Sequence, residues 1–379
     1  MQYFKNTHEH GLSKWWAWGF VFWLTFLGWI VAQLFLTSPL IPIAQEIDPE
    51  LGQAFIDSST SMLEGVNMAL IGFATLLFII STVLGLIFSL VALTTKSSAA
   101  RGFGIAGGIG VALSCVSVVL LSPLASSPDG TDALNRLLAQ SPISYALVLL
   151  VFPATLVLLY IGQKFILKRT ILSLHTAFSK FRFGRTVQAI AVTWAVLGSL
   201  AFLLNALGIT PLSYSFDPSR FFIYAAVSLA LIPLQSATEE IVFRGYLNQA
   251  VENLSRNKWI AFTLTSLLFM AMHLANPEAL SGAEAGILPI VMSGYFFFGF
   301  AACLLVWMDD GLESAIGVHA ANNTFAAVFV NYQNSVLPTP SIFQIQANPV
   351  LDSILTIATL SIILIALYAL RPKPVVRAA

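Results

Sequence analysis

Long apolar runs separated by short polar stretches dominate the amino-acid sequence. A membrane-spanning helix needs about 20 consecutive, mostly apolar residues, and ten runs along the chain approach or exceed this length. They cover residues 15–36, 66–94, 103–121, 143–167, 186–207, 221–237, 259–275, 287–308, 314–330 and 350–370. This pattern predicts an all-α fold, a polytopic transmembrane helical bundle with about ten spans.

The composition agrees with a protein that faces lipid rather than water. Hydrophobic residues make up 57% of the 379 residues and charged residues only 9%, whereas a soluble domain typically carries about 25% charged residues. The polar side chains are too few to cover a water-facing surface, which excludes a soluble enzyme and a disordered regulator. The net charge is zero, so the lipid bilayer is an expected partner and nucleic acid is not.

The basic residues predict an orientation, because Lys and Arg concentrate in the cytoplasmic connections of membrane proteins. If the N-terminus is cytoplasmic, the ten spans place 16 of the 18 Lys and Arg residues on the cytoplasmic side. Only Arg136 and Arg220 then fall on the other side. We therefore expect a multi-pass protein of a bacterial inner membrane with both termini in the cytoplasm.

Ionisable side chains inside a span are costly and mark functional sites by default. In this chain they gather in the C-terminal half, together with an amide. The set consists of Glu239, Glu240, Arg244, His273, His319 and Asn323.

Helix geometry predicts that these side chains meet. Glu240 and Arg244 are i,i+4 neighbours that can form an ion pair, while Glu239 points about 100° away and is free for other work. Glu239 lies 17 residues before Arg256 and His273 lies 17 residues after it. A helical hairpin that turns near Arg256 therefore places the carboxylate and the imidazole at the same depth.

The chemistry of the set is that of water attack on an acyl carbon. A buried carboxylate beside an imidazole can hold and deprotonate water. His319 and Asn323, which share one helix face, supply two hydrogen-bond donors for an oxyanion. Alternatively, Glu239, His273 and His319 could bind zinc, although the chain has no HExxH motif. A transporter that relays protons and a non-catalytic scaffold or immunity protein are the other hypotheses.

Three motifs in this region resemble the CPBP family, which comprises CAAX proteases and bacteriocin-processing enzymes and includes the Rce1-type prenyl protease. The family pattern is EExxxR, then FxxxH, then HxxxN on successive helices. It appears here at residues 239–244 (EEIVFR), 269–273 (FMAMH) and 319–323 (HAANN). The resemblance covers about residues 220–332.

The resemblance implies an intramembrane endopeptidase that cleaves membrane-associated peptides or proteins, either of the glutamate type or a metalloendopeptidase. Glu239 and His273 would activate water, and His319 and Asn323 would form the oxyanion hole. Glu240, Arg244 and Phe269 would support them. We favour no cofactor, with zinc possible.

The same resemblance divides the chain into three regions. Residues 1–219 form an N-terminal transmembrane region of about five spans with no assigned role. Residues 220–332 form the Rce1-like catalytic core, and residues 333–379 form the last transmembrane helix and a basic cytoplasmic tail.

Overall fold

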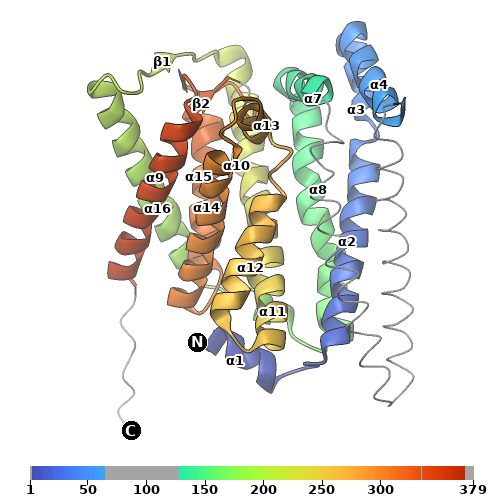
Figure 1. The fold of residues 1–379 in the computed structure, drawn as a ribbon, viewed down its shortest axis with the longest axis vertical. Coiled ribbons are helices and arrows are strands. Elements are labelled where there is room, and N and C mark those ends of the chain that lie inside the picture. The colour runs from blue at the N-terminus through green and yellow to red at the C-terminus, as the bar shows by residue number, and fades with distance from the viewer. Residues whose placement is uncertain (1, 65–127, 334, 372–379) are drawn as a thin grey trace.

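Upright helices form most of the part of the chain that the computed structural model describes, namely residues 2–64, 128–333 and 335–371 (Figure 1). The helices of the N-terminal half are α1 (Gln2–Glu9), α2 (Trp15–Thr37), α3 (Leu40–Ile47), α4 (Pro49–Glu64), α7 (Pro128–Gln140), α8 (Pro142–Ile161) and α9 (Phe183–Ala206). Those of the C-terminal half are α10 (Pro218–Glu240), α11 (Asn248–Ser255), α12 (Lys258–Ala271), α13 (Pro277–Glu284), α14 (Leu288–Asp309), α15 (Glu313–Val328) and α16 (Pro349–Ala369). A π-helical segment, η3 (Ile241–Leu247), joins α10 to α11.

Six segments in the described residues are long and apolar enough to cross a membrane, which confirms the predicted helical membrane bundle. They are Trp15–Ile47, Pro142–Ile166, Phe183–Ala206, Pro218–Ser255, Leu288–Asp309 and Pro349–Ala369. The predicted runs 66–94 and 103–121 lie outside the described residues. The runs 259–275 and 314–330 correspond to α12 and α15, which have 14 and 16 residues and are shorter than a full span.

Local sequence sets the ends of the helices that carry polar residues. The Asp217 carboxylate accepts a hydrogen bond from the Ser219 amide ahead of α10, and Asn257 caps the amides of Trp259 and Ile260 at the start of α12. Such caps satisfy amides that have no partner within the helix. Arg256 adopts the left-handed conformation that ends α11, with φ of 56°. The hairpin turn predicted near Arg256 is therefore confirmed.

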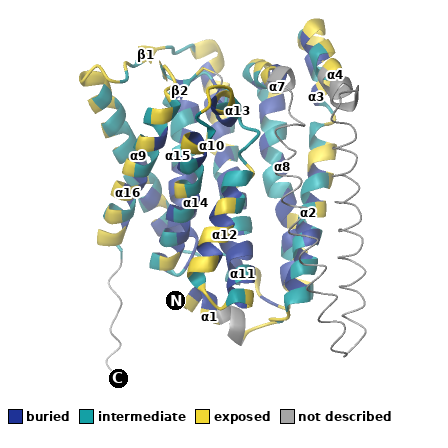
Figure 2. Cartoon of the chain, viewed as in Figure 1, coloured by how far each residue is buried: buried dark blue, intermediate teal, exposed yellow. Residues whose placement is uncertain are grey.

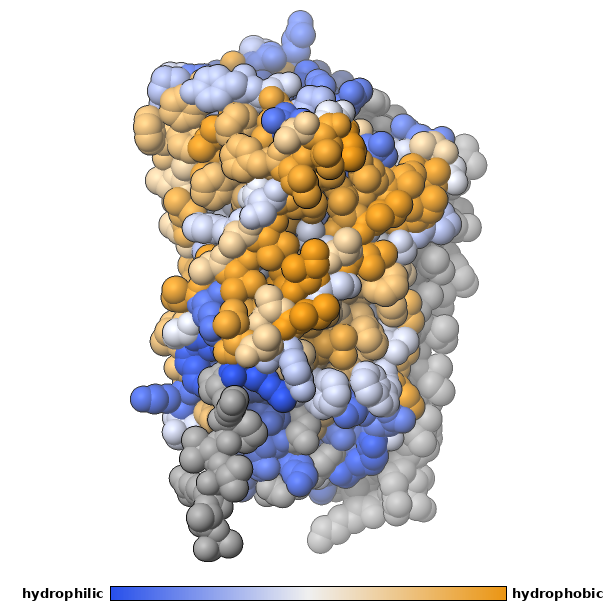
Figure 3. Space-filling view, turned by 90° about the vertical axis from the view of Figure 1, so that its left-hand side faces the viewer, coloured by the Kyte–Doolittle hydropathy of each residue, from blue (hydrophilic) through white to orange (hydrophobic). Residues whose placement is uncertain are grey.

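α10 and α15 pack against each other at the centre of the bundle. α8 packs against α10, and α9 against α15, while α12, α14 and α16 are neighbours in that order. Figure 2 shows buried residues concentrated on the inner faces of these helices. α1 and the C-terminal end of α16 lie toward the lower end in Figure 1, and Figure 3 shows an apolar belt between two more polar ends.

Two ion pairs fix the lower end of α15. Arg182 pairs with Glu313 at 2.8 Å, and the buried Arg185 pairs with Asp309 at 2.8 Å. Arg182 directly precedes α9 and Arg185 lies in its first turn, so the two pairs join the start of α9 to the α14–α15 turn. Further along, a Cβ on Gly317 would lie 2.5 Å from the Thr186 carbonyl oxygen of α9. Only glycine allows so close an approach of α15 to α9.

A small three-stranded sheet lies at the other end of the bundle. Its order is β1 (Ser213–Tyr214), β3 (Phe343–Ile345), β2 (Val330–Tyr332). β1 pairs antiparallel with β3, and β2 pairs parallel with it. Because β1 precedes α10, β2 follows α15 and β3 precedes α16, the sheet holds the upper ends of these three helices together.

His175 lies in the connection before α9 and joins it to α8 and to the α14–α15 turn. Its backbone oxygen accepts from the Leu312 amide at 2.7 Å, and its Nε2 lies 3.1 Å from the Tyr160 hydroxyl. The imidazole contacts the rings of Tyr160 and Phe181. Burial lowers the pKa of His175 to about 4, so the folded protein keeps this imidazole neutral.

We expect the stability to fall with acidification. The unfolded-state pKa of a histidine is about 6.5. The contribution of the neutral, buried His175 to the free energy of unfolding is therefore complete above pH 6.5 and is lost as the pH falls toward 4. Between pH 7 and pH 5 the loss is at most about 2 kcal/mol, measurable by thermal unfolding in detergent. His175→Phe keeps an aromatic ring but cannot titrate, so it should flatten this dependence. An unchanged dependence in the variant would contradict the assignment.

Candidate active site

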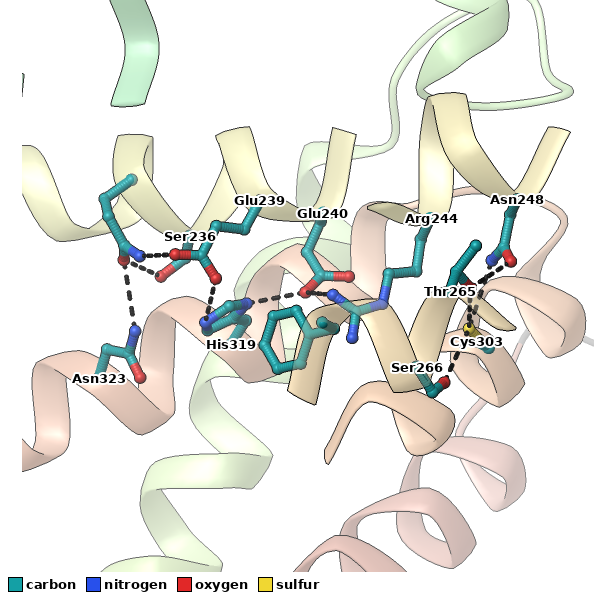
Figure 4. A network of polar contacts seen from close by, with 12 residues as sticks. Ser236, Glu239, Glu240, Arg244, Asn248, Thr265, Ser266, Cys303, His319 and Asn323 are labelled. Atoms are coloured by element: carbon teal, nitrogen blue, oxygen red, sulfur yellow. Dashed lines mark hydrogen bonds and ion pairs between the residues drawn. The ribbon is translucent and has the colours of Figure 1, made fainter. Parts of the chain in front are cut away.

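A fully buried ion pair lies where α10 gives way to η3. Arg244 Nη1 donates to Glu240 Oε1 at 3.0 Å, and both side chains are completely inaccessible to solvent (Figure 4). The predicted i,i+4 contact is therefore confirmed. The Arg244 guanidinium also lies 4.2 Å from the centre of the Phe269 ring. The ring face of Phe269 contributes a cation–π contact in a place that water does not reach.

His319 lies between the two adjacent glutamates. Its Nδ1 is 2.7 Å from Glu240 Oε1, and its Nε2 is 3.7 Å from Glu239 Oε2. Because Glu240 engages Nδ1, Nε2 is the ring nitrogen that faces Glu239. The side chain of Glu239 keeps 13% of its surface exposed, whereas Glu240 is wholly buried. The two glutamates are therefore in different environments, as the helix geometry predicts.

The run 259–275 predicts His273 on a helix, but α12 ends at Ala271 and His273 lies two residues beyond, in a turn. This turn leads to Asn276, which precedes Pro277 and is therefore disfavoured in the helical conformation. His273 Nδ1 is 2.7 Å from the Phe269 carbonyl oxygen. Since a carbonyl only accepts, Nδ1 carries a proton, and in the neutral ring Nε2 is left as an acceptor.

The His273 ring is held between two aromatic rings. Its centre is 4.5 Å from that of Phe269 and 4.4 Å from that of Tyr295, against which it stacks. The Tyr295 hydroxyl in turn accepts from Asn276. His273 is within electrostatic range of Glu239 and His319. The structure thus brings the two predicted histidines and the free carboxylate into one cluster.

Asn323 reaches this cluster through a residue that the motif analysis missed. Asn323 Nδ2 donates to Gln235 Oε1 at 3.3 Å, and Gln235 Nε2 donates to Glu239 Oε1. Asn322 donates to Asn323 Oδ1 at 3.1 Å and does not contact the glutamates directly. Gln235 carries a usable signal in the sequence, because it is a polar residue within the apolar run 221–237 and lies one turn before Glu239.

A second buried polar group continues toward the lower end from Arg244 (Figure 4). Asn248 donates to the Cys303 sulfur at 3.3 Å and accepts from the Thr265 hydroxyl at 2.7 Å. These contacts join α11, α12 and α14. The free thiol of Cys303 is completely buried, so it takes part in packing.

The predicted zinc alternative can be compared with this geometry. Among the described residues, no three His, Cys, Asp or Glu side chains are gathered as metal ligands. Nδ1 of His319 is engaged by Glu240, and Nδ1 of His273 by a backbone carbonyl. Each imidazole is thus fixed through Nδ1 by a protein oxygen, which leaves Nε2 as the ring nitrogen for chemistry or for a ligand.

Comparison with known proteins assigns the chain to a family. A family model described as type II CAAX prenyl endopeptidase Rce1-like matches residues 218–325. The chain is 31% identical over 263 residues to the uncharacterized protein YyaK of Bacillus subtilis (strain 168), an alignment that covers 68% of this chain and 84% of the relative. No solved structure matches the chain. These findings confirm the resemblance that the three motifs predict: the chain belongs to the Rce1-like family of CAAX-type intramembrane proteases.

Proposed function

We propose that this protein is an intramembrane endopeptidase in which Glu239 is the general base. The observation that carries the proposal is the contrast between the two neighbouring glutamates. Glu240 is committed to an ion pair with Arg244, whereas Glu239 is partly exposed, accepts from the neutral Gln235 amide and lies 3.7 Å from His319 Nε2. A carboxylate with these partners can accept a proton from a water molecule.

His273 assists the same step. Its Nε2, left as an acceptor by the bond from Nδ1 to the Phe269 carbonyl, can hold the water that Glu239 deprotonates. The water oxygen forms a bond to the peptide carbonyl carbon, and its proton passes to Glu239. When the tetrahedral intermediate collapses, the C–N bond breaks and Glu239 returns the proton to the leaving nitrogen.

His319 and Asn323 are proposed as the oxyanion hole. In this role His319 carries a proton on each ring nitrogen, so that Nδ1–H donates to Glu240 and Nε2–H is presented beside Glu239. The Asn323 amide presents another N–H from the same helix face. Donors positioned in advance stabilise negative charge that develops only in the transition state. This role uses the two side chains that α15 contributes and needs no serine or cysteine nucleophile.

We propose that catalysis is of the glutamate type and runs without a metal. Support comes from Glu239, because its partly exposed carboxylate accepts from a neutral amide and can take a proton from water without a metal. The substrate class is membrane-associated peptides or proteins, and residues 220–332 carry the chemistry with the flanking helices as support. We also propose a bacterial inner membrane with both termini cytoplasmic, supported by the charge asymmetry of the connections.

Replacing the two glutamates should separate their roles. Glu239→Gln should lower peptide hydrolysis by at least about 10²-fold while leaving the fold intact. The glutamine amide has the size and shape of the carboxylate but cannot accept a proton from water. Glu240→Gln should instead lower thermal stability, since breaking a buried pair costs about 3–5 kcal/mol. Mass spectrometry of membrane peptides with each variant, beside unfolding temperatures in detergent, measures both. A stable but inactive Glu240→Gln protein would reverse the assignment.

The oxyanion hole has its own kinetic signature. Asn323→Ala should lower kcat by about 10²–10³ with little change in KM, because the charge it meets exists only in the transition state. Asn322→Ala is the matched control and should have a much smaller effect. Gln235→Ala should also lower kcat, and its combination with Asn323→Ala should be less than additive, because Gln235 joins Asn323 to Glu239. Full activity of Asn323→Ala would overturn the role.

Metal dependence can be tested directly. We expect purified protein to remain active after treatment with a strong chelator, and His319→Ala to lose activity without losing a stoichiometric metal. Elemental analysis of wild type and variant provides the measurement. One zinc per chain, lost together with activity in His319→Ala, would replace the glutamate mechanism with a metal-dependent one and leave the protease assignment standing.

A further inference from the structure

An apolar groove lies between α14 and α16, apart from the catalytic cluster. Its volume is about 250 Å³, and it is lined by Leu304, Trp307, Met308, Leu364, Ile365 and Tyr368. α14 ends at Asp309 and α16 at Ala369. The groove therefore opens toward the lower end of the bundle in Figure 1, the end at which α1 lies.

Two cations lie over aromatic rings that form the rim of this groove. Lys258 Nζ is 4.2 Å from the centre of the Trp307 ring. The Arg371 guanidinium is 3.9 Å from the Tyr368 ring, and its Nη2 donates to the Tyr368 hydroxyl at 3.0 Å. Both charges thus stand at the end of an apolar channel, one beside each of its two helices.

Three acidic side chains at the α14–α15 turn are engaged by groups other than Lys258 and Arg371. Asp309 is paired with Arg185, Glu313 with Arg182, and Asp310 accepts from the backbone amide of Tyr3. The two cations at the rim therefore keep their positive charge available to an incoming anion. An occupant of this site needs a hydrocarbon part and, at one end of it, a negative charge.

We propose that this groove binds an anionic phospholipid, with an acyl chain between α14 and α16 and the phosphate between Lys258 and Arg371. Trp and Tyr prefer the level of lipid headgroups, and each basic residue near an anionic leaflet adds about 1 kcal/mol of attraction. A zwitterionic lipid offers the same chain but no net charge. The positive charge of Lys258 and Arg371 therefore selects an anionic headgroup, and the apolar groove binds the acyl chain.

The experiment compares two lipids that differ in headgroup alone. The full chain, purified in detergent, is incubated with palmitoyl-oleoyl phosphatidylglycerol or with the matching phosphatidylcholine, and retained lipid is counted by native mass spectrometry. Wild type should retain phosphatidylglycerol more strongly, on the order of tenfold. The variant Lys258→Gln/Arg371→Gln should lose this preference. Equal retention of both lipids by wild type, or an unchanged preference in the variant, would overturn the proposal.

Two further variants make the test specific to this groove. Lys164 lies 5.4 Å from the Phe165 ring at the same end of the molecule but beside another helix, so Lys164→Gln is a matched control that should behave as wild type. Leu364→Trp fills the groove and should lower retention of both lipids. If Leu364→Trp retained as much lipid as wild type, the acyl chain would not lie in this groove and the proposal would be overturned. Glu239→Gln should bind as wild type, so the result is independent of proteolysis.

Discussion

The buried pair of Glu240 and Arg244 is the interaction on which the site depends. A charge in the interior of a membrane protein is tolerated only when other groups compensate it. Glu240 Oε1 therefore receives two donors, Arg244 Nη1 at 3.0 Å and His319 Nδ1 at 2.7 Å. In the part of the chain that the structure describes, Arg244 Nε and Nη2 have no hydrogen-bond partner. The face of the Phe269 ring, 4.2 Å from the guanidinium, provides electrostatic stabilisation of the positive charge in their place. One ion pair thus holds η3, α12 and α15 in a fixed relation.

The same pair orients the chemistry. Because Glu240 holds Nδ1 of His319, the opposite nitrogen must face Glu239, and because Phe269 packs under Arg244, its carbonyl and ring are in place for His273. The position of α15 receives separate support from Arg182 and Arg185, which tie the α14–α15 turn to the start of α9. Ion pairs at the lower end of the bundle and in its centre therefore both fix the position of α15.

Much of this arrangement follows from the sequence because the residues lie within regular helices. The i,i+4 spacing predicts the Glu240–Arg244 pair, the apolar runs predict the bundle, and the turn at Arg256 folds α12 back beside η3. The π-helical segment after Glu240 could not be predicted, because no single residue type specifies it. Nor could the end of α12 before His273 be predicted, because the apolar pattern continues through residues 272–275.

Gln235 shows why motif residues alone describe such a site incompletely. A catalytic carboxylate must be held as well as present, and within an apolar bundle a neutral amide can hold it without adding a second charge that would need its own partner. The Gln235 amide donates to Glu239 with its nitrogen and accepts from Asn323 with its oxygen. It therefore sets the distance between the proposed base and the proposed oxyanion donor, which stand on different helices. A carboxylate in its place would repel Glu239, and an aliphatic side chain would leave both groups without an anchor.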